Sequence, residues 1–227
     1  MNLKFLSTIF FTSMIRKYFA FETSKVVNHA FHYVIQTSQK YNIDESHAFK
    51  HSLDVLHYSN RIYQSELSKK PFLKEQKDVI FTSSIIHDMC DKKYMNEQMG
   101  VQEMRNYMKD YLEPSQLDAV SDIISTMSYS KVMKHGYPFL GKYQDAYHIV
   151  READLLAAYD LERCIIYQMM HEKYSYTESL PFAIDLFHKR ILRYIEDDLF
   201  VTAYSKKKAA ELHIQALEDI ENIKLIL

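Results

Sequence analysis

The chain has 227 residues, a formal net charge of −2, 47% hydrophobic residues and 26% charged residues. This length suits one packed domain, and the nearly neutral charge gives no general attraction to nucleic acid, so no nucleic-acid partner is expected. Three glycines and two cysteines exclude a glycine-rich phosphate loop, a disulfide framework and a four-cysteine zinc site, and we expect a cytoplasmic protein.

The first 20 residues form a separate N-terminal segment. Phe5 to Ile15 is largely apolar but too short to span a bilayer, so no stable membrane span is expected. No small-residue cleavage site follows it, as one would after a signal peptide. Two interpretations remain open: a docked N-terminal helix, or a targeting or membrane-surface segment.

Apolar residues recur three and four positions apart along nearly the whole chain, which is the spacing of amphipathic helices. No segment alternates with period two for long enough to demand a sheet. We therefore predict an all-α fold, with residues 21–227 forming one domain. The expected helices are 21–41, 46–67, 74–86, 96–111, 115–127, 144–170, 181–195 and 202–225.

Two histidines lie together on the predicted helix 46–67. His47 and His51 are one turn apart on an otherwise apolar face, whereas His57 belongs to a polar stripe that should face water. One buried histidine is usually a satisfied core residue. Two on one face, together with acidic partners elsewhere in the chain, indicate a site instead.

The acidic partners lie in two later apolar segments. His87 and Asp88 close the apolar run from Val79 to Ile86, and burying such a pair costs several kcal/mol unless a metal or another partner offsets it. Asp154 lies inside an apolar helical stretch, where the alternative to metal ligation is a buried salt bridge with Arg151.

The sequence therefore offers two imidazoles and two carboxylates as ligands for one divalent metal ion: His51, His87, Asp88 and Asp154. Such a mixed set suits Mn²⁺, Fe²⁺, Co²⁺, Ni²⁺ or Mg²⁺ better than structural zinc. Four protein ligands in an octahedron leave two positions, where a water and a phosphate oxygen could bind together.

Four short segments resemble known patterns in order: Ser46 to His51 (Ser-His-Asp-x-x-His, with Ala48 in place of the Asp), His87 to Lys93 (His-Asp-x-x-Asp-x-Lys), Met127 to Lys131 (Ile-Ser-Phe-like) and Ala153 to Ala158 (Ala-Asp-x-Leu-x-Ala). This order resembles the HD superfamily of metal-dependent phosphohydrolases, and within it the small bacterial-type HD hydrolases that act on nucleotides. The resemblance covers about residues 25 to 170 and implies a compact HD-domain helical bundle. The C-terminal helices, 181–227, lie outside it and could set a homodimer or cover the pocket.

Roles for the neighbouring residues follow from the proposed chemistry. Asp91 is the candidate general base or water-orienting carboxylate, with an ion pair to Lys92 or Lys93 as the alternative. By the resemblance, His47 would protonate a leaving oxygen. The candidate phosphate contacts are Lys92, Lys131 and Arg151.

The resemblance implies an enzyme in which metal-bound water cleaves a phosphoester or phosphoanhydride bond. The expected substrate is a nucleotide or another small phosphorylated metabolite. Two alternatives are a non-catalytic HD module that binds a nucleotide and signals to a partner, and a helical interaction protein without a metal. The presence of both Asp91 and His47 favours the enzyme over the binding module.

Overall fold

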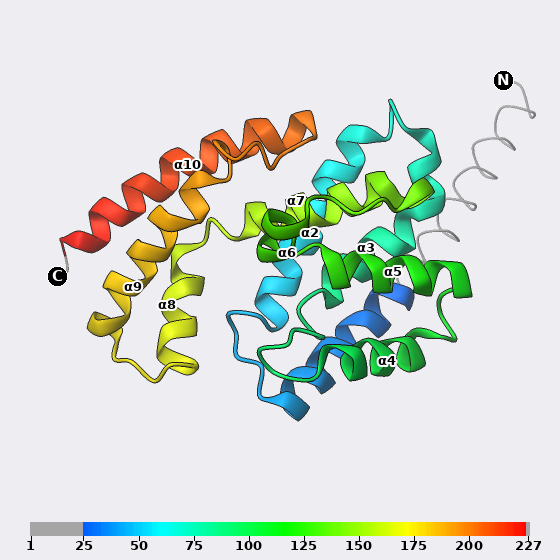
Figure 1. Ribbon diagram of the computed structural model, residues 1–227, viewed down its shortest axis with the longest axis horizontal. Coiled ribbons are helices and arrows are strands. Elements are labelled where there is room, and N and C mark those ends of the chain that lie inside the picture. Colours follow the sequence, from blue (N-terminus) through cyan, green and yellow to red (C-terminus); the bar gives the residue numbers. More distant parts are fainter. Residues whose placement is uncertain (1–24, 226–227) are drawn as a thin grey trace, which may run out of the picture.

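The computed structural model describes residues 25–225, and the expected N-terminal segment, 1–20, lies outside them. Within the described residues the regular structure is helical and no strand occurs (Figure 1), which confirms the predicted all-α class. None of the helices in this range is both long enough and apolar enough to cross a membrane.

The helices follow one another with short connections. The first described helix spans residues 25–41. It is followed by α2 (Phe49–Glu66), the 3₁₀ helix η1 (Pro71–Gln76), α3 (Lys77–Ile86), α4 (Glu97–Met108), α5 (Pro114–Thr126), α6 (Tyr129–His135) and the 3₁₀ helix η2 (Gly141–Tyr143). The C-terminal part comprises α7 (Gln144–Ala157), α8 (Leu161–Met170), α9 (Tyr176–Lys189), the 3₁₀ helix η3 (Ile191–Arg193) and α10 (Ala203–Lys224).

Helix α3 lies at the centre of the bundle. Every residue from Val79 to Ile86 is buried, because α2, α5 and α7 all pack against this helix. A helix that is apolar on all sides must be covered in this way. Small side chains allow α2 and α3 to approach closely, and the hydroxyls of Ser59 and Ser84 are hydrogen-bonded across them at 2.6 Å. The buried end of α3 therefore delivers His87 and Asp88 to the interior.

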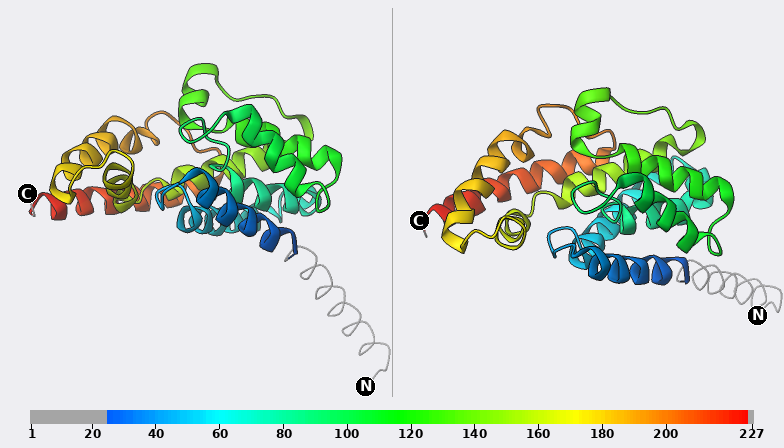
Figure 2. Two further views of the ribbon diagram at one scale, coloured as in Figure 1. Left: turned by 90° about the horizontal axis from the view of Figure 1, so that it is seen from below. Right: turned by 60° about the horizontal axis from the view of Figure 1, so that its bottom comes forward.

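Helices α8 and α9 form a pair beside this bundle, and α10 runs from the bundle back along them (Figure 2). The segment that leads into α10 is fixed by α7. Glu152 is fully buried and accepts hydrogen bonds from the backbone N–H groups of Val201, at 2.6 Å, and Thr202, at 3.2 Å. Charged acceptors make strong hydrogen bonds with backbone donors, so Glu152 holds the start of α10 against α7.

Several predicted helix boundaries are wrong. The single helix expected over 144–170 is divided, because Asp160 accepts a hydrogen bond from Arg163 N at 3.3 Å and so starts α8 afresh. The helix expected over 181–195 begins instead at Tyr176, where Ser175 and Glu178 form a capping box. The short helix α6 was not expected at all.

Candidate metal centre

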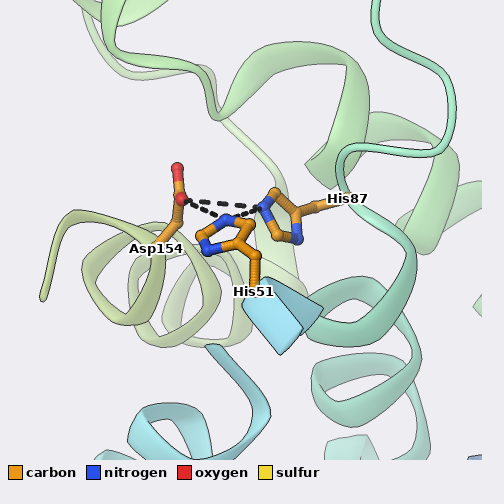
Figure 3. A group of neighbouring side chains, drawn as sticks. All are labelled: His51, His87 and Asp154. Atoms are coloured by element: carbon orange, nitrogen blue, oxygen red, sulfur yellow. Dashed lines mark hydrogen bonds and ion pairs between the residues drawn. The ribbon is translucent and has the colours of Figure 1, made fainter. Parts of the chain in front are cut away.

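The four predicted ligands come from three parts of the bundle and converge in its interior. His51 lies in the first turn of α2, His87 and Asp88 directly follow α3, and Asp154 lies in the last turn of α7. Figure 3 shows His51, His87 and Asp154 pointing toward one another. The fold therefore brings together residues that are far apart in the chain.

The ligand atoms are spaced as a metal ion requires. The Nε2 atoms of His51 and His87 are 3.1 Å apart. Asp154 Oδ1 lies 3.2 and 3.5 Å from these two nitrogens, and Asp88 Oδ2 lies 3.4 and 3.3 Å from them. Bonds of roughly 2.1 Å hold neighbouring ligands about 3.0 Å apart in an octahedron and about 3.4 Å apart in a tetrahedron. His51, His87 and Asp154 can therefore hold a divalent metal ion, and Asp88 Oδ2 lies beside the two nitrogens as a further candidate ligand.

A hydrogen bond outside the cluster orients His87. Its Nδ1 donates to the carbonyl oxygen of Ser84 at 3.0 Å, since a carbonyl can only accept. The other ring nitrogen, Nε2, is thereby directed at the cluster. Metal-binding histidines are commonly oriented by such a bond. The hydrogen bond to Ser84 therefore supports His87 as a candidate ligand.

The two carboxylates of the cluster suit a cation. Burial alone would raise the pKa values of Asp88 and Asp154, but the neighbouring imidazoles outweigh it and hold both far below their usual value, so both are ionised. Burial lowers the pKa of His51 to about 4. His87 is also buried, but the carboxylates of Asp88 and Asp154 outweigh this effect and raise its pKa to about 10.

A cavity of about 280 Å³ opens beside the cluster. His87, Asp88 and Asp154 form part of its lining. Four carboxylates and five cationic side chains line it, the latter being Lys92, Lys93, Lys131, Arg163 and Arg190. Apolar side chains complete the wall, among them Ile124, Met127, Leu186 and Ile191. The cavity thus combines a candidate metal site with a positively charged and partly apolar wall.

Three of the residues with predicted roles, Asp91, Lys92 and Lys131, line this cavity. Asp91 Oδ1 accepts a hydrogen bond from Lys93 N at 2.9 Å, and its Oδ2 is 3.8 Å from Lys93 Nζ. Asp91 therefore lies at the cavity and also pairs with a lysine, Lys93. The ammonium of Lys131 is bound by Glu97 and by the carbonyl oxygen of Ser125.

The expectation for Arg151 is corrected by the structure. This side chain is only 1% exposed and does not line the cavity. Its guanidinium donates to Leu199 O at 2.6 Å, lies 3.6 Å from Glu152 Oε1 and stacks on the ring of Tyr137. The alternative salt bridge with Asp154 is also not formed, because that carboxylate pairs with the two histidines.

The expectation for His47 is corrected in part. His47 lies before α2, which begins at Phe49, because Asp44 accepts hydrogen bonds from the backbone N–H and hydroxyl of Ser46 and forms a separate turn. The side chain is nevertheless buried at the cavity. Burial, only partly opposed by Asp88, lowers the pKa of His47 well below its usual value. A neutral imidazole is a poor match for the expected proton donor.

Three cationic residues at the cavity were not predicted: Lys93, Arg163 and Arg190. Arg163, from α8, donates to Asp88 Oδ2 at 3.3 Å and also to the carbonyl oxygen of Ser46. It therefore fixes one metal ligand to the turn before α2. The only sequence signal was for Lys93, which ends the His87 to Lys93 motif.

No protein-family model, curated protein or solved structure matches this chain. The resemblance to the HD superfamily therefore remains a prediction from short motifs. The function has to be argued from the geometry of the metal cluster and its cavity.

Proposed function

We propose that the protein is a metal-dependent phosphohydrolase of the HD type, acting on a nucleotide or a similarly small phosphorylated metabolite. The observation that carries this proposal is a cluster of two buried histidines and two ionised carboxylates beside a cavity with five lysine and arginine side chains. Structural metal sites are closed, whereas catalytic sites keep one side open. Here Asp88 and Asp154 are 15% and 19% exposed, both toward the cavity.

The chemistry of this donor set fits a hydrolase. A divalent ion held by His51, His87, Asp88 and Asp154 would acidify a water and polarise a phosphoryl group. Manganese, iron, cobalt, nickel and magnesium ions all suit these nitrogen and oxygen ligands.

The remaining cavity residues have roles of their own. Asp91 Oδ2 would accept the proton that the attacking water loses. The ammonium groups of Lys92 and Lys93 would balance the charge of the phosphoryl oxygens. The apolar wall near Met127 would contact the organic part of the substrate and exclude water.

The proposal is tested by measuring phosphate and pyrophosphate release from a panel of nucleotides and small phosphomonoesters. The protein is stripped of metal and then given Mn²⁺, Co²⁺, Ni²⁺, Fe²⁺ or Mg²⁺. The control is the double variant His87→Ala/Asp88→Ala. Metal-dependent release that the control lacks would support the hydrolase, and the product would identify the bond that is cut.

Metal and nucleotide binding, measured on the same protein samples, separate the alternatives. Tight binding of one metal ion and of a nucleotide without any turnover would favour a non-catalytic HD module that signals to a partner. No metal binding at all would favour a helical interaction protein.

A further inference from the structure

A chain of hydrogen bonds runs along the cavity wall from Asp44 to Lys93. Asp44 Oδ1 contacts the hydroxyl of Ser46, and its Oδ2 lies 3.1 Å from the hydroxyl of Tyr94. Both hydroxyls contact Nδ1 of His47, at 2.6 Å from Ser46 and 3.1 Å from Tyr94. On the other side of the ring, His47 Nε2 lies 3.0 Å from Lys93 Nζ.

The two ends of the chain fix the direction of every bond in it. An ionised carboxylate can only accept and an ammonium can only donate. The hydroxyls of Ser46 and Tyr94 therefore donate to Asp44, and each can accept from His47 Nδ1–H. His47 Nε2 carries no proton and accepts from Lys93. The geometry thus selects the Nδ1–H tautomer of a neutral ring.

This direction of the hydrogen bonds means that His47 accepts from Lys93 and holds its ammonium in place. The side chain of Lys93 is long and flexible, and a point charge of this kind is useful at a site only when it is held. His47 Nε2 holds the ammonium on one side, Asp91 Oδ2 lies 3.8 Å away, and the ring of Tyr167 lies beneath it at 5.6 Å. An ammonium has three N–H groups, so at least one donor remains for a ligand in the cavity.

We propose that Lys93 is the residue that contacts the phosphoryl group of the substrate, and that His47 is a positioning residue which holds Lys93 and donates no proton. This inference rests on the proposed phosphohydrolase function. The other two lysines are less well placed. Lys131 is bound by Glu97, and no hydrogen bond or ion pair fixes Lys92 within residues 25–225.

The tautomer of His47 is tested first, because its measurement does not require an active enzyme. Nitrogen-15 NMR of the full-length protein at pH 7 should show His47 with a protonated Nδ1 and an unprotonated Nε2. The signal is assigned by its loss in His47→Gln. An Nε2–H tautomer or an imidazolium would overturn the inference.

The role is tested with two substitutions at one position. The amide oxygen of Gln can accept the hydrogen bond from Lys93 but a glutamine cannot protonate a leaving group. His47→Gln should therefore keep most of the kcat/KM, and His47→Ala should lose it. Lys93→Gln should lower kcat/KM by at least roughly tenfold with unchanged metal content. Equal damage in both His47 variants together with a silent Lys93→Gln would contradict the assignment.

Binding of inorganic phosphate to the metal-loaded protein, measured by calorimetry, separates this inference from the proposed function. Lys93→Gln should weaken phosphate binding at least roughly tenfold, and His47→Gln should leave it within a few-fold of wild type. If this pattern holds but no substrate is hydrolysed, the hydrolase proposal fails and the phosphate contact stands. If phosphate binding is the same in Lys93→Gln as in wild type, the contact is wrong.

Discussion

His51 and His57 occupy the same helix but opposite environments, and this difference decides which of them can bind a metal. His51 is 2% exposed and faces the cluster, whereas His57 is exposed on the outer face of α2. The sequence alone distinguished the two histidines, because they lie on different faces of the predicted helix. The same reasoning identified Asp88 and Asp154, because an unpaired carboxylate in an apolar segment would be costly.

Asp88→Ala is expected to abolish tight metal binding, since it removes a charged candidate ligand and one of the two hydrogen-bond partners of Arg163. His57→Ala should bind metal as the wild type does. Metal content after dialysis, measured by mass spectrometry of the elements, compares the two variants. Wild-type content in Asp88→Ala, or a severe loss in His57→Ala, would refute the site.

Asp91→Asn is expected to keep the metal and to lose activity. The amide preserves the size of the side chain but cannot accept a proton from water, so the rate should fall roughly 100- to 10,000-fold. The check is kcat with the substrate found in the panel, alongside metal content. Unchanged turnover would remove Asp91 from the reaction.

His148 should make the protein less stable in acid. Burial, assisted by Arg151, lowers the pKa of this histidine to about 4, and its Nδ1 has no hydrogen-bond partner among the described residues. The unfolded chain takes up the proton near pH 6.5, so stability is full above that pH and falls as the pH drops toward 4. The loss amounts to as much as about 3 kcal/mol.

Urea unfolding at several pH values tests this expectation. Between pH 6.5 and 4.5 the free energy of unfolding of His148→Phe should fall less than that of the wild type. His57→Ala, which changes an exposed histidine, should follow the wild type. Parallel curves for all three proteins would show that His148 is not responsible.

Other residues could not be assigned from the sequence because their partners are distant. Arg163 bonds to Asp88 and to Ser46, both far earlier in the chain, and a charged residue in an amphipathic helix is expected to face water. The turn formed by Asp44 and Ser46 also escaped prediction, because helical spacing continues through it. Arg151 was misplaced for the same reason as Arg163: spacing along a helix does not reveal which neighbour a face will meet.

At the scale of elements, the positions of helices were more predictable than their ends. Apolar spacing identified α2, α4, α5 and α10 closely. It ran through the break before α8, since the residues around Ala158 favour a helix and only the cap at Asp160 marks the new start. It also placed the start of α9 at Pro181, whereas the helix begins at Tyr176 and Pro181 lies inside it.

Gly100 in α4 controls how closely this helix approaches the loop that carries the metal ligands. A Cβ atom at this position would lie 2.7 Å from Met95 Sδ and 3.1 Å from Cys90 Cα. The sulfur can move, but the backbone of Cys90 is close to Asp88. Gly100→Ala should therefore cost about 1–3 kcal/mol in packing, more than the gain of up to about 1 kcal/mol in helix propensity.

Chemical denaturation measures this difference, with metal affinity as a second readout. The cost of Gly100→Ala is measured twice, once in the wild type and once in the Met95→Ala background. The cost should be smaller in the Met95→Ala background, but only by the part that arises from the contact with the sulfur. A Gly100→Ala protein as stable as the wild type would show that the loop adjusts freely.

At the scale of the whole molecule, the cavity is shared between two parts of the chain. The bundle from α2 to α7 supplies the candidate metal ligands, and α8 and α9 with the residue that follows them supply Arg163, Tyr167 and Arg190. The all-α class followed from the sequence because spacing is a local property. The composition of the cavity did not, because it depends on how α8 and α9 pack beside the bundle.

Metal binding should stabilise the whole protein. An ion present at 100 times its dissociation constant adds about 2.7 kcal/mol to the free energy of unfolding. For a chain of this size that corresponds to an increase in Tm of roughly 5–10 °C. Thermal unfolding with and without a chelator tests this, and His87→Ala/Asp88→Ala should show no metal-dependent shift. Equal shifts in both proteins would place the bound ion elsewhere.

The origin of the ligands in three helices has a consequence for local motion. A single ion bound by residues of α2, of the end of α3 and of α7 would join these helices into one cooperative unit, because none of them could open locally without releasing it. Amide hydrogen exchange in these three helices should therefore slow together when the metal is added. The outer half of α10, which touches no ligand, should keep its own exchange rate.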